Sequence, residues 1–275
     1  MRYQQPESNQ VWRNSLYAGD IYLLPKMQEA AELAAEVNTL LYNVFGSQHI
    51  AIIHKVLNED EFFNGMKIIR KELFENDRFI KLLRTYLIAL GFCSGEVAFE
   101  PLRLRAIRPN GHLNPKAKAV YYPHRDTWYG HGQSVIVGWI PLHDQQKKQT
   151  FELFPDWLDQ AVPNNSEIFD YDQWRSGNSD KRIGWQNKNT GLTASYPQAI
   201  ECVDVGERIG FSCKQAQGLF FSGAHFHQTL KQSTGFCRYS VDFRLIHLSD
   251  SKKNIGAPNA DNRSTGSSLK DYVHL

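Results

Sequence analysis

The residues best suited to bind a metal are His124 and Asp126, in the tripeptide HRD, and two histidines much later in the chain, His225 and His227. An H-x-D pair with one distant histidine supplies two imidazoles and a carboxylate. Such a set occupies one face of an octahedral metal ion and leaves the other face open, as in non-haem Fe(II) oxygenases. On a strand, residues 124 and 126 would point to the same face. The pattern therefore predicts a mononuclear iron site.

The third ligand stays open at this point, because His225 and His227 are also two positions apart and would share a strand face. Arg238 follows them. Its planar guanidinium offers two parallel N–H donors that match a carboxylate, and 2-oxoglutarate is a dicarboxylate. A strand histidine is more often a structural residue than a ligand. The ordered set of H-x-D, distal histidine and arginine nevertheless favours an Fe(II) site that uses 2-oxoglutarate and O2.

The sequence around these residues resembles the Fe(II)/2-oxoglutarate-dependent dioxygenase superfamily, and most closely its phytanoyl-CoA dioxygenase-like branch of small biosynthetic oxygenases. The matching stretches, within residues 97–248, are YPHRDTW (122–128), VGWIPL (137–142), FFSGAHFHQT (220–229) and RYSVDFR (238–244). The resemblance implies a double-stranded β-helix, or jelly-roll, core. It also implies that His124, Asp126 and His227 bind the iron, because the ligand histidine of the superfamily commonly stands ten intervening residues before the arginine. Arg238 and Ser240 would then bind 2-oxoglutarate.

The resemblance also implies the reaction: hydroxylation of a small-molecule metabolite, a biosynthetic intermediate, with desaturation or ring closure as variants. Halogenating members have Gly or Ala in place of the carboxylate ligand, so Asp126 argues against halogenation. Two alternatives are a protein hydroxylase and a non-catalytic jelly-roll binding module. The complete ligand set, together with Arg238 and Ser240, argues against the second.

Four residues are candidates for substrate contacts: Arg105, Trp128, Gln133 and Arg244. Arg105 would share a strand face with Arg103, where the two side chains could bind an anionic substrate or form structural ion pairs. Trp128 and Gln133 follow the H-x-D pair and resemble the corresponding stretch of small biosynthetic oxygenases. Arg244 is either a pocket residue or the partner of a nearby acid.

Composition and charge fit a single globular oxygenase domain spanning residues 1–275. Hydrophobic residues make up 41% and charged residues 22%, and the formal net charge is +2. A chain with no basic block gives no support to nucleic-acid binding. The sequence contains no run of 18 apolar residues, so we expect no membrane span. The four cysteines form no C-x-x-C pair and the N-terminus lacks an apolar signal, so we expect a cytoplasmic protein. The oligomeric state is left open.

Helical spacing of apolar residues predicts three helices within residues 1–95: 27–45, 59–73 and 77–90. Alternating or buried apolar runs predict strands at 97–107, 134–142, 149–153, 208–213, 218–222, 225–230 and 236–248, and residues 120–122 lead into the H-x-D pair. Helices followed by many short strands indicate an α+β fold with N-terminal helices packed on a jelly-roll core.

Two segments lack a clear period. Residues 155–197 form a long polar insertion that contains Trp157, Trp174 and Trp185. A loop of this length within a compact domain often closes over a ligand, so we expect a lid. Residues 249–275 are rich in Ser, Asn, Asp and Gly, which predicts a loosely ordered C-terminal tail.

Overall fold

The computed structural model describes residues 1–46, 49–176, 196–201 and 203–275. The α-helices are α1 (Asn9–Tyr17), α2 (Gln28–Phe45), α3 (Glu59–Glu75), α4 (Asp77–Ala89), α5 (Tyr171–Ser176) and α7 (Leu248–Lys252). Short 3-10 helices are η1 (Ile50–Lys55), η2 (Gly111–Leu113), η3 (Pro115–Tyr121), η4 (Asp126–Tyr129), η5 (Lys147–Gln149), η6 (Pro155–Trp157), η7 (Ser166–Ile168) and η8 (Ser268–Asp271). Among the described residues, no helix is long and apolar enough to cross a membrane.

The three long N-terminal helices confirm the helical prediction to within a few residues at each end. α2 ends where Gly46 adopts a left-handed conformation, with a φ of 62°, which glycine reaches without the steric cost of a Cβ. α3 begins with a capping box, in which Asn58 accepts from the Glu61 amide and Glu61 accepts from the Asn58 amide. Both helices bury one apolar stripe, so their position is fixed by packing as well as by capping.

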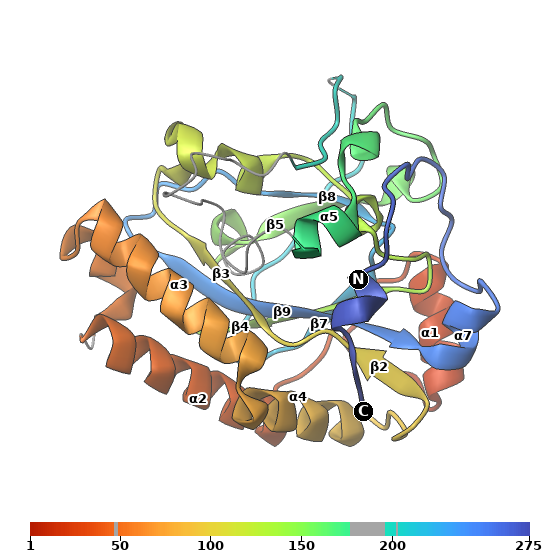
Figure 1. The fold of residues 1–275 in the computed structure, drawn as a ribbon, viewed down its shortest axis with the longest axis horizontal. Coiled ribbons are helices and arrows are strands. Elements are labelled where there is room, and N and C mark those ends of the chain that lie inside the picture. Colours follow the sequence, from red (N-terminus) through yellow and green to blue (C-terminus); the bar gives the residue numbers. More distant parts are fainter. Residues whose placement is uncertain (47–48, 177–195, 202) are drawn as a thin grey trace.

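Two antiparallel sheets complete the fold: the larger lies against these helices, and β5 and β8 of the smaller lie on the far side of β9 (Figure 1). In the described residues the larger sheet has the order β1-β7-β4-β9-β2-β10, with β3 also paired to β9. Its strands are β1 (Tyr22–Leu23), β2 (Val97–Phe99), β3 (Arg103–Ile107), β4 (Ile136–Pro141), β7 (Leu219–Ser222), β9 (Arg238–His247) and β10 (Val273–His274). The smaller sheet has the order β6-β5-β8, with β5 (Phe151–Phe154), β6 (Ile209–Gly210) and β8 (Phe226–Thr229). The fold is therefore α+β, as predicted.

Strand β9 separates the helical core from the polar interior of the protein. Alternate side chains of a strand point to opposite faces of its sheet. One set packs in the main core with α2, α3 and α4: Tyr239, Val241, Phe243 and Leu245. The other set is polar and buried: Arg238, Ser240, Asp242 and Arg244. The face of the larger sheet that is turned away from the helices thus carries a row of charged groups.

Two predictions about strands were wrong in detail. The strand expected at 97–107 is divided into β2 and β3, with Pro101 between them. Proline has no N–H to donate to a ladder, which favours an interruption there. The H-x-D pair also does not lie on a regular strand. His124 forms an isolated bridge with His227, and Asp126 begins the 3-10 helix η4.

The C-terminal segment 249–275 is packed onto the domain, so the prediction of a loose tail was wrong. Asp250 accepts a 2.7 Å hydrogen bond from Arg13 Nε, and both side chains are nearly buried. The last strand, β10, pairs with β2. The polar side chains that suggested disorder find partners far away in the sequence, which a local pattern does not reveal.

The predicted lid, residues 155–197, lies partly outside the described residues, because 177–195 and with them Trp185 are not described. The described part contains η6, η7 and α5. Trp157 donates from Nε1 to the Asp204 carbonyl at 3.1 Å, and Trp174 lines the central cavity. This part of the insertion is thus folded against its surroundings.

Candidate active site

His124 and His227 are held in matching orientations by backbone hydrogen bonds. The main chains pair reciprocally, with both N–H···O distances at 3.0 Å. The Nδ1 atom of His124 lies 2.8 Å from the Tyr122 carbonyl, and that of His227 lies 2.9 Å from the His225 carbonyl. Because a carbonyl oxygen only accepts, each Nδ1 carries the proton and each Nε2 keeps a free lone pair.

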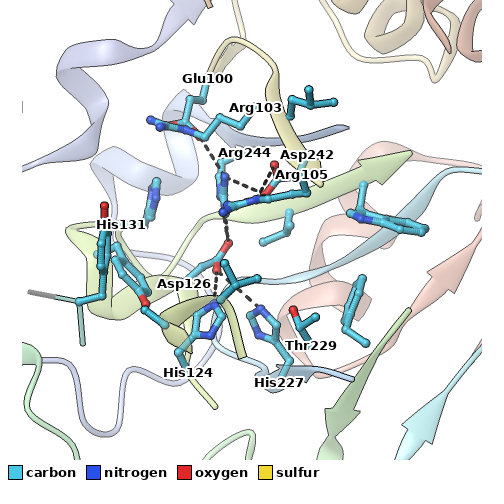
Figure 2. A pocket seen from close by; sticks show the side chains of 18 of the residues that line it. Glu100, Arg103, Arg105, His124, Asp126, His131, His227, Thr229, Asp242 and Arg244 are labelled. Atoms are coloured by element: carbon cyan, nitrogen blue, oxygen red, sulfur yellow. Dashed lines mark hydrogen bonds and ion pairs between the residues drawn. The ribbon is translucent and has the colours of Figure 1, made fainter. Parts of the chain in front are cut away.

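Both free Nε2 atoms face one oxygen of Asp126 (Figure 2). Asp126 Oδ1 is 3.7 Å from His124 Nε2 and 3.8 Å from His227 Nε2. One donor atom from each of the three residues lies within 4.8 Å of the others. The set is two imidazole nitrogens and one carboxylate oxygen, which fits a facially bound Fe(II) ion and leaves positions for exogenous ligands.

The electrostatics of the three residues favour their metal-binding protonation states. Burial, helped by the neighbouring His227, lowers the pKa of His124 to about 3, and burial also lowers the pKa of His227. Burial alone would raise the pKa of Asp126, but the Arg244 guanidinium and the two imidazoles outweigh it and lower this pKa. At neutral pH the histidines are neutral and the aspartate is ionised, which are the forms that bind a cation.

The second oxygen of Asp126 is fixed by Arg244 on β9. Asp126 Oδ2 accepts from Arg244 Nε and Nη2, each at 2.9 Å. Arg244 Nη1 continues the network to Glu100 Oε2 at 3.3 Å and to Asp242 Oδ2 at 3.2 Å. Asp242 in turn receives a two-point contact from Arg105, with Nε–Oδ1 at 3.1 Å and Nη2–Oδ2 at 2.9 Å. These bonds orient the carboxylate whose first oxygen faces the histidines.

Arg238 lies in the same interior without an acidic partner among the described residues. Its side chain is 2% exposed, Nη1 donates to Ser240 Oγ at 3.2 Å, and Nε has no hydrogen-bond partner. Burial and the nearby Arg105 lower the pKa of Arg238 to about 10, so it remains charged at neutral pH. A buried cation that lacks an anion is unfavourable by itself. An anionic ligand at this position would supply the missing partner.

A single cavity of about 190 Å³ joins the three potential ligands to Arg238. Its walls are partly aromatic: Tyr129, Trp139, Phe169, Trp174 and Tyr196. The Arg238 guanidinium carbon lies 5.9 Å from the centre of the Trp139 ring. The cavity therefore combines a metal-binding face, a free guanidinium and apolar walls, which is the composition of a small-molecule site.

His225 is turned away from this cavity, although its spacing made it a candidate ligand. Its ring is fully buried, and Nε2 lies 3.1 Å from the Gly19 carbonyl. Burial lowers the pKa of His225 to about 4, which keeps the ring neutral. Of the two histidines, His227 is the one that meets His124 and Asp126.

Two of the four predicted substrate residues lie outside the cavity. Trp128 is fully buried and donates from Nε1 to Asp261 at 2.7 Å, and Gln133 donates to the Asn254 carbonyl. Their surroundings give no support to a substrate role. Arg105 and Arg244 do line the cavity, but both are engaged in ion pairs.

Sequence reasoning missed two acidic residues of the network, Glu100 and Asp242. The strict alternation along RYSVDFR places residue 242 on the same strand face as Arg238 and Ser240, so Asp242 could have been predicted from the sequence. Glu100 stands in the break between β2 and β3. No periodic signal marks that position.

No family model matches the chain, and no curated protein matches it. Among solved structures, it is similar to the apo non-haem monooxygenase ThoJ (13% identity, TM-score 0.49, over 86% of this chain and 76% of that one). It is also similar to EvdO2 from Micromonospora carbonacea var. aurantiaca complexed with 2-oxoglutarate (12% identity, TM-score 0.45, over 94% of this chain and 99% of that one). A third similar structure is SnoN, the non-haem α-ketoglutarate-dependent epimerase from nogalamycin biosynthesis (14% identity, TM-score 0.40, over 87% of this chain and 84% of that one). At these TM-scores the function has to be inferred from the site itself.

Proposed function

We propose that this protein is an Fe(II)- and 2-oxoglutarate-dependent oxygenase that hydroxylates a small-molecule metabolite. The observation that carries the proposal is one cavity that holds both the His124, Asp126 and His227 donor set and the unpaired Arg238. We further propose that the two antiparallel sheets form a jelly-roll core, and that the chain belongs to the phytanoyl-CoA dioxygenase-like branch. The four sequence stretches that resemble this branch support that part of the proposal.

Each residue has a defined task in this proposal. His124, His227 and Asp126 Oδ1 hold the iron, while Arg244 fixes Asp126 through its other oxygen. Arg238 and Ser240 bind the far carboxylate of 2-oxoglutarate, and this carboxylate is the anionic partner that the buried guanidinium lacks. The aromatic walls exclude water and position the substrate. Iron, when bound with 2-oxoglutarate and O2, supplies the oxidising chemistry that attacks a substrate C–H bond.

Hydroxylation is proposed in preference to halogenation because of Asp126. This carboxylate would occupy the coordination position that a halide would need. Desaturation and ring closure begin with the same hydrogen abstraction, so the substrate held in the cavity decides among these outcomes. The intact donor set and the free Arg238 speak against a binding module without catalysis.

The proposal is tested by the release of succinate from 2-oxoglutarate in the presence of Fe(II), O2 and a pool of small metabolites. We expect His124→Ala, Asp126→Ala and His227→Ala to lose iron-dependent succinate formation. His225→Ala serves as the matched control, since its ring is buried nearby but turned away from the cavity, and it should retain turnover. Succinate formation that persists in the three ligand variants would refute the proposal.

A further inference from the structure

The cavity contains a second guanidinium without an acidic partner, that of Arg70 on α3. Arg70 donates from Nε to the Leu104 carbonyl of β3 at 3.3 Å. Among the described residues, no carboxylate lies within ion-pair distance of it. Its side chain is partly exposed and borders the cavity that holds the proposed iron ligands. The two Nη groups therefore remain available to a ligand.

The charges that line the cavity leave Arg70 uncompensated. Among the residues that the structure describes, five arginines and three carboxylates border it: Arg70, Arg103, Arg105, Arg238, Arg244, Glu100, Asp126 and Asp242. Each carboxylate contacts an arginine: Glu100 contacts Arg103, Asp126 contacts Arg244, and Asp242 contacts Arg105. In this described part of the lining, Arg238 and Arg70 have no carboxylate of their own. A bound Fe(II) ion and a 2-oxoglutarate dianion would cancel each other in charge, so the excess of positive charge persists in the loaded site.

Arg105 follows Leu104, whose carbonyl accepts from Arg70, and both arginine side chains line the same cavity. Burial, followed by the charge of Arg105, lowers the pKa of Arg70 to about 10, so Arg70 stays protonated at neutral pH. The side chain of Arg105 is 31% exposed and uses Nε and Nη2 on Asp242, which leaves Nη1 free. Two neighbouring guanidinium groups with free donors are well suited to an oxyanion.

An aromatic wall stands next to these two arginines. Phe74 follows Arg70 by one helical turn and lines the same cavity. The Arg103 guanidinium carbon lies 5.2 Å from the centre of the Phe74 ring and 5.5 Å from that of Trp174. The Phe169 and Trp174 rings are 6.3 Å apart, centre to centre. A flat apolar group could pack here while an attached anion reaches Arg70.

We propose that Arg70, assisted by Arg105, binds an anionic group of the substrate, and that the substrate is a small organic acid or phosphate ester with a flat apolar part. The proposal rests on the proposed function only in calling the ligand the substrate of the iron site. The anion-binding role itself follows from the unpaired Arg70 guanidinium, the unused Nη1 of Arg105 and the aromatic wall beside them. It defines a chemical class of substrate that the metal ligands alone do not.

The test compares matched probes by calorimetric titration: 3-phenylpropanoate, phenyl phosphate and the neutral 3-phenylpropanamide. The wild type, Arg70→Gln, Arg70→Lys and Lys71→Gln are titrated with and without Mn(II) and 2-oxoglutarate, in the absence of O2. Lys71→Gln is the matched control. Lys71 follows Arg70 on α3 and is exposed, and its replacement by glutamine removes one positive charge, as Arg70→Gln does. Arg70→Lys keeps the charge and reports on whether the cavity is still folded.

We expect the wild type and Lys71→Gln to bind at least one anion about tenfold or more tightly than the amide, the size of a charge-assisted hydrogen bond. Arg70→Gln should lose this preference, Arg70→Lys should keep part of it, and 2-oxoglutarate affinity should be unchanged in both. The tighter of the two anions then distinguishes a carboxylate from a phosphate substrate. Equal binding of anions and amide by the wild type, or an undiminished preference in Arg70→Gln, overturns the inference. Failure of the wild type to bind Mn(II) and 2-oxoglutarate would count instead against the proposed function.

Discussion

At the scale of single residues, the two oxygens of Asp126 have separate partners. Oδ1 faces His124 Nε2 and His227 Nε2, while Oδ2 is held by two nitrogens of Arg244. A ligand carboxylate that is fixed from behind keeps its orientation when the metal is absent, and such supporting bonds strengthen metal binding. The positively charged Arg244 also stabilises the ionised form of Asp126. The donor set is thus organised before any ion enters.

The proposed role of Arg238 predicts that Arg238→Lys weakens 2-oxoglutarate binding by about tenfold or more. Lysine preserves the charge but loses the planar pair of donors that a carboxylate accepts. The measurement is a titration of 2-oxoglutarate into the Mn(II)-loaded protein without O2. Arg208→Lys is the control, because Arg208 pairs with Glu152 and its side chain is 55% exposed. Unchanged affinity in Arg238→Lys would remove this residue from the carboxylate site.

At the scale of elements, the C-terminal segment supports the loop that carries the H-x-D pair. The Asp261 carboxylate accepts from Arg125 Nε at 3.0 Å, Trp128 Nε1 at 2.7 Å and the Val162 amide at 2.9 Å. Arg125 stands between His124 and Asp126 in the chain and is buried. The segment thus holds the loop from the side away from the cavity.

This arrangement predicts that Asp261→Ala lowers the free energy of unfolding by about 3 kcal/mol, because it leaves the buried Arg125 cation without its partner. Metal affinity should also fall, since the loop bearing His124 and Asp126 loses support. Urea unfolding and Mn(II) binding would measure the two effects. Glu167→Ala, which breaks an exposed pair with Arg263, should change either quantity little. A stable Asp261→Ala protein with normal metal affinity would contradict the supporting role of the segment.

The same elements explain which structural features could be predicted from sequence. The three long helices have strong apolar periods, and β9 alternates from Arg238 to Leu245, so both were predictable. The packing of the tail was not, because the bonds between Arg13 and Asp250 and between Arg125 and Asp261 join residues far apart in the chain. No local pattern reports such pairs.

The candidate site shows the same division. Spacing and residue type indicated His124, Asp126 and Arg238, while residue spacing alone left His225 and His227 equivalent. The resemblance to the superfamily favoured His227 through its distance from Arg238. In the structure the rings point in different directions, since His225 faces Gly19 and His227 faces Asp126. That direction depends on where β8 bridges the H-x-D loop, which is a tertiary contact.

At the scale of the whole molecule, the larger sheet divides an apolar helical side from a charged cavity side. The helices pack on one face of β9, and the cavity lies on the other (Figures 1 and 2). Several histidines are buried on the cavity side or near it. Burial lowers the pKa of His131 to about 4 and that of His225 to about 4.

These buried histidines predict a loss of stability in mild acid. Their pKa values in the folded protein lie below the ordinary value of 6.5, so the unfolded chain binds more protons as the pH falls. The contribution of a neutral buried histidine to the free energy of unfolding is complete above pH 6.5 and is lost below it. For one such residue the loss between pH 7.5 and pH 5 is about 2 kcal/mol. Urea unfolding of the metal-free protein at the two pH values should show this loss, and His225→Gln should reduce it. An equal loss in His225→Gln would mean that this imidazole is not buried in its neutral form.

The central claim is that one cavity holds iron on His124, Asp126 and His227 and 2-oxoglutarate on Arg238. The most direct test is anomalous diffraction at the iron edge from crystals grown with Fe(II) and 2-oxoglutarate in the absence of O2. We predict one iron peak about 2.0–2.2 Å from His124 Nε2, His227 Nε2 and an Asp126 oxygen, the usual range for such ligands. The far carboxylate of 2-oxoglutarate should contact Arg238. Iron bound elsewhere, or a 2-oxoglutarate carboxylate that does not reach Arg238, would contradict the claim.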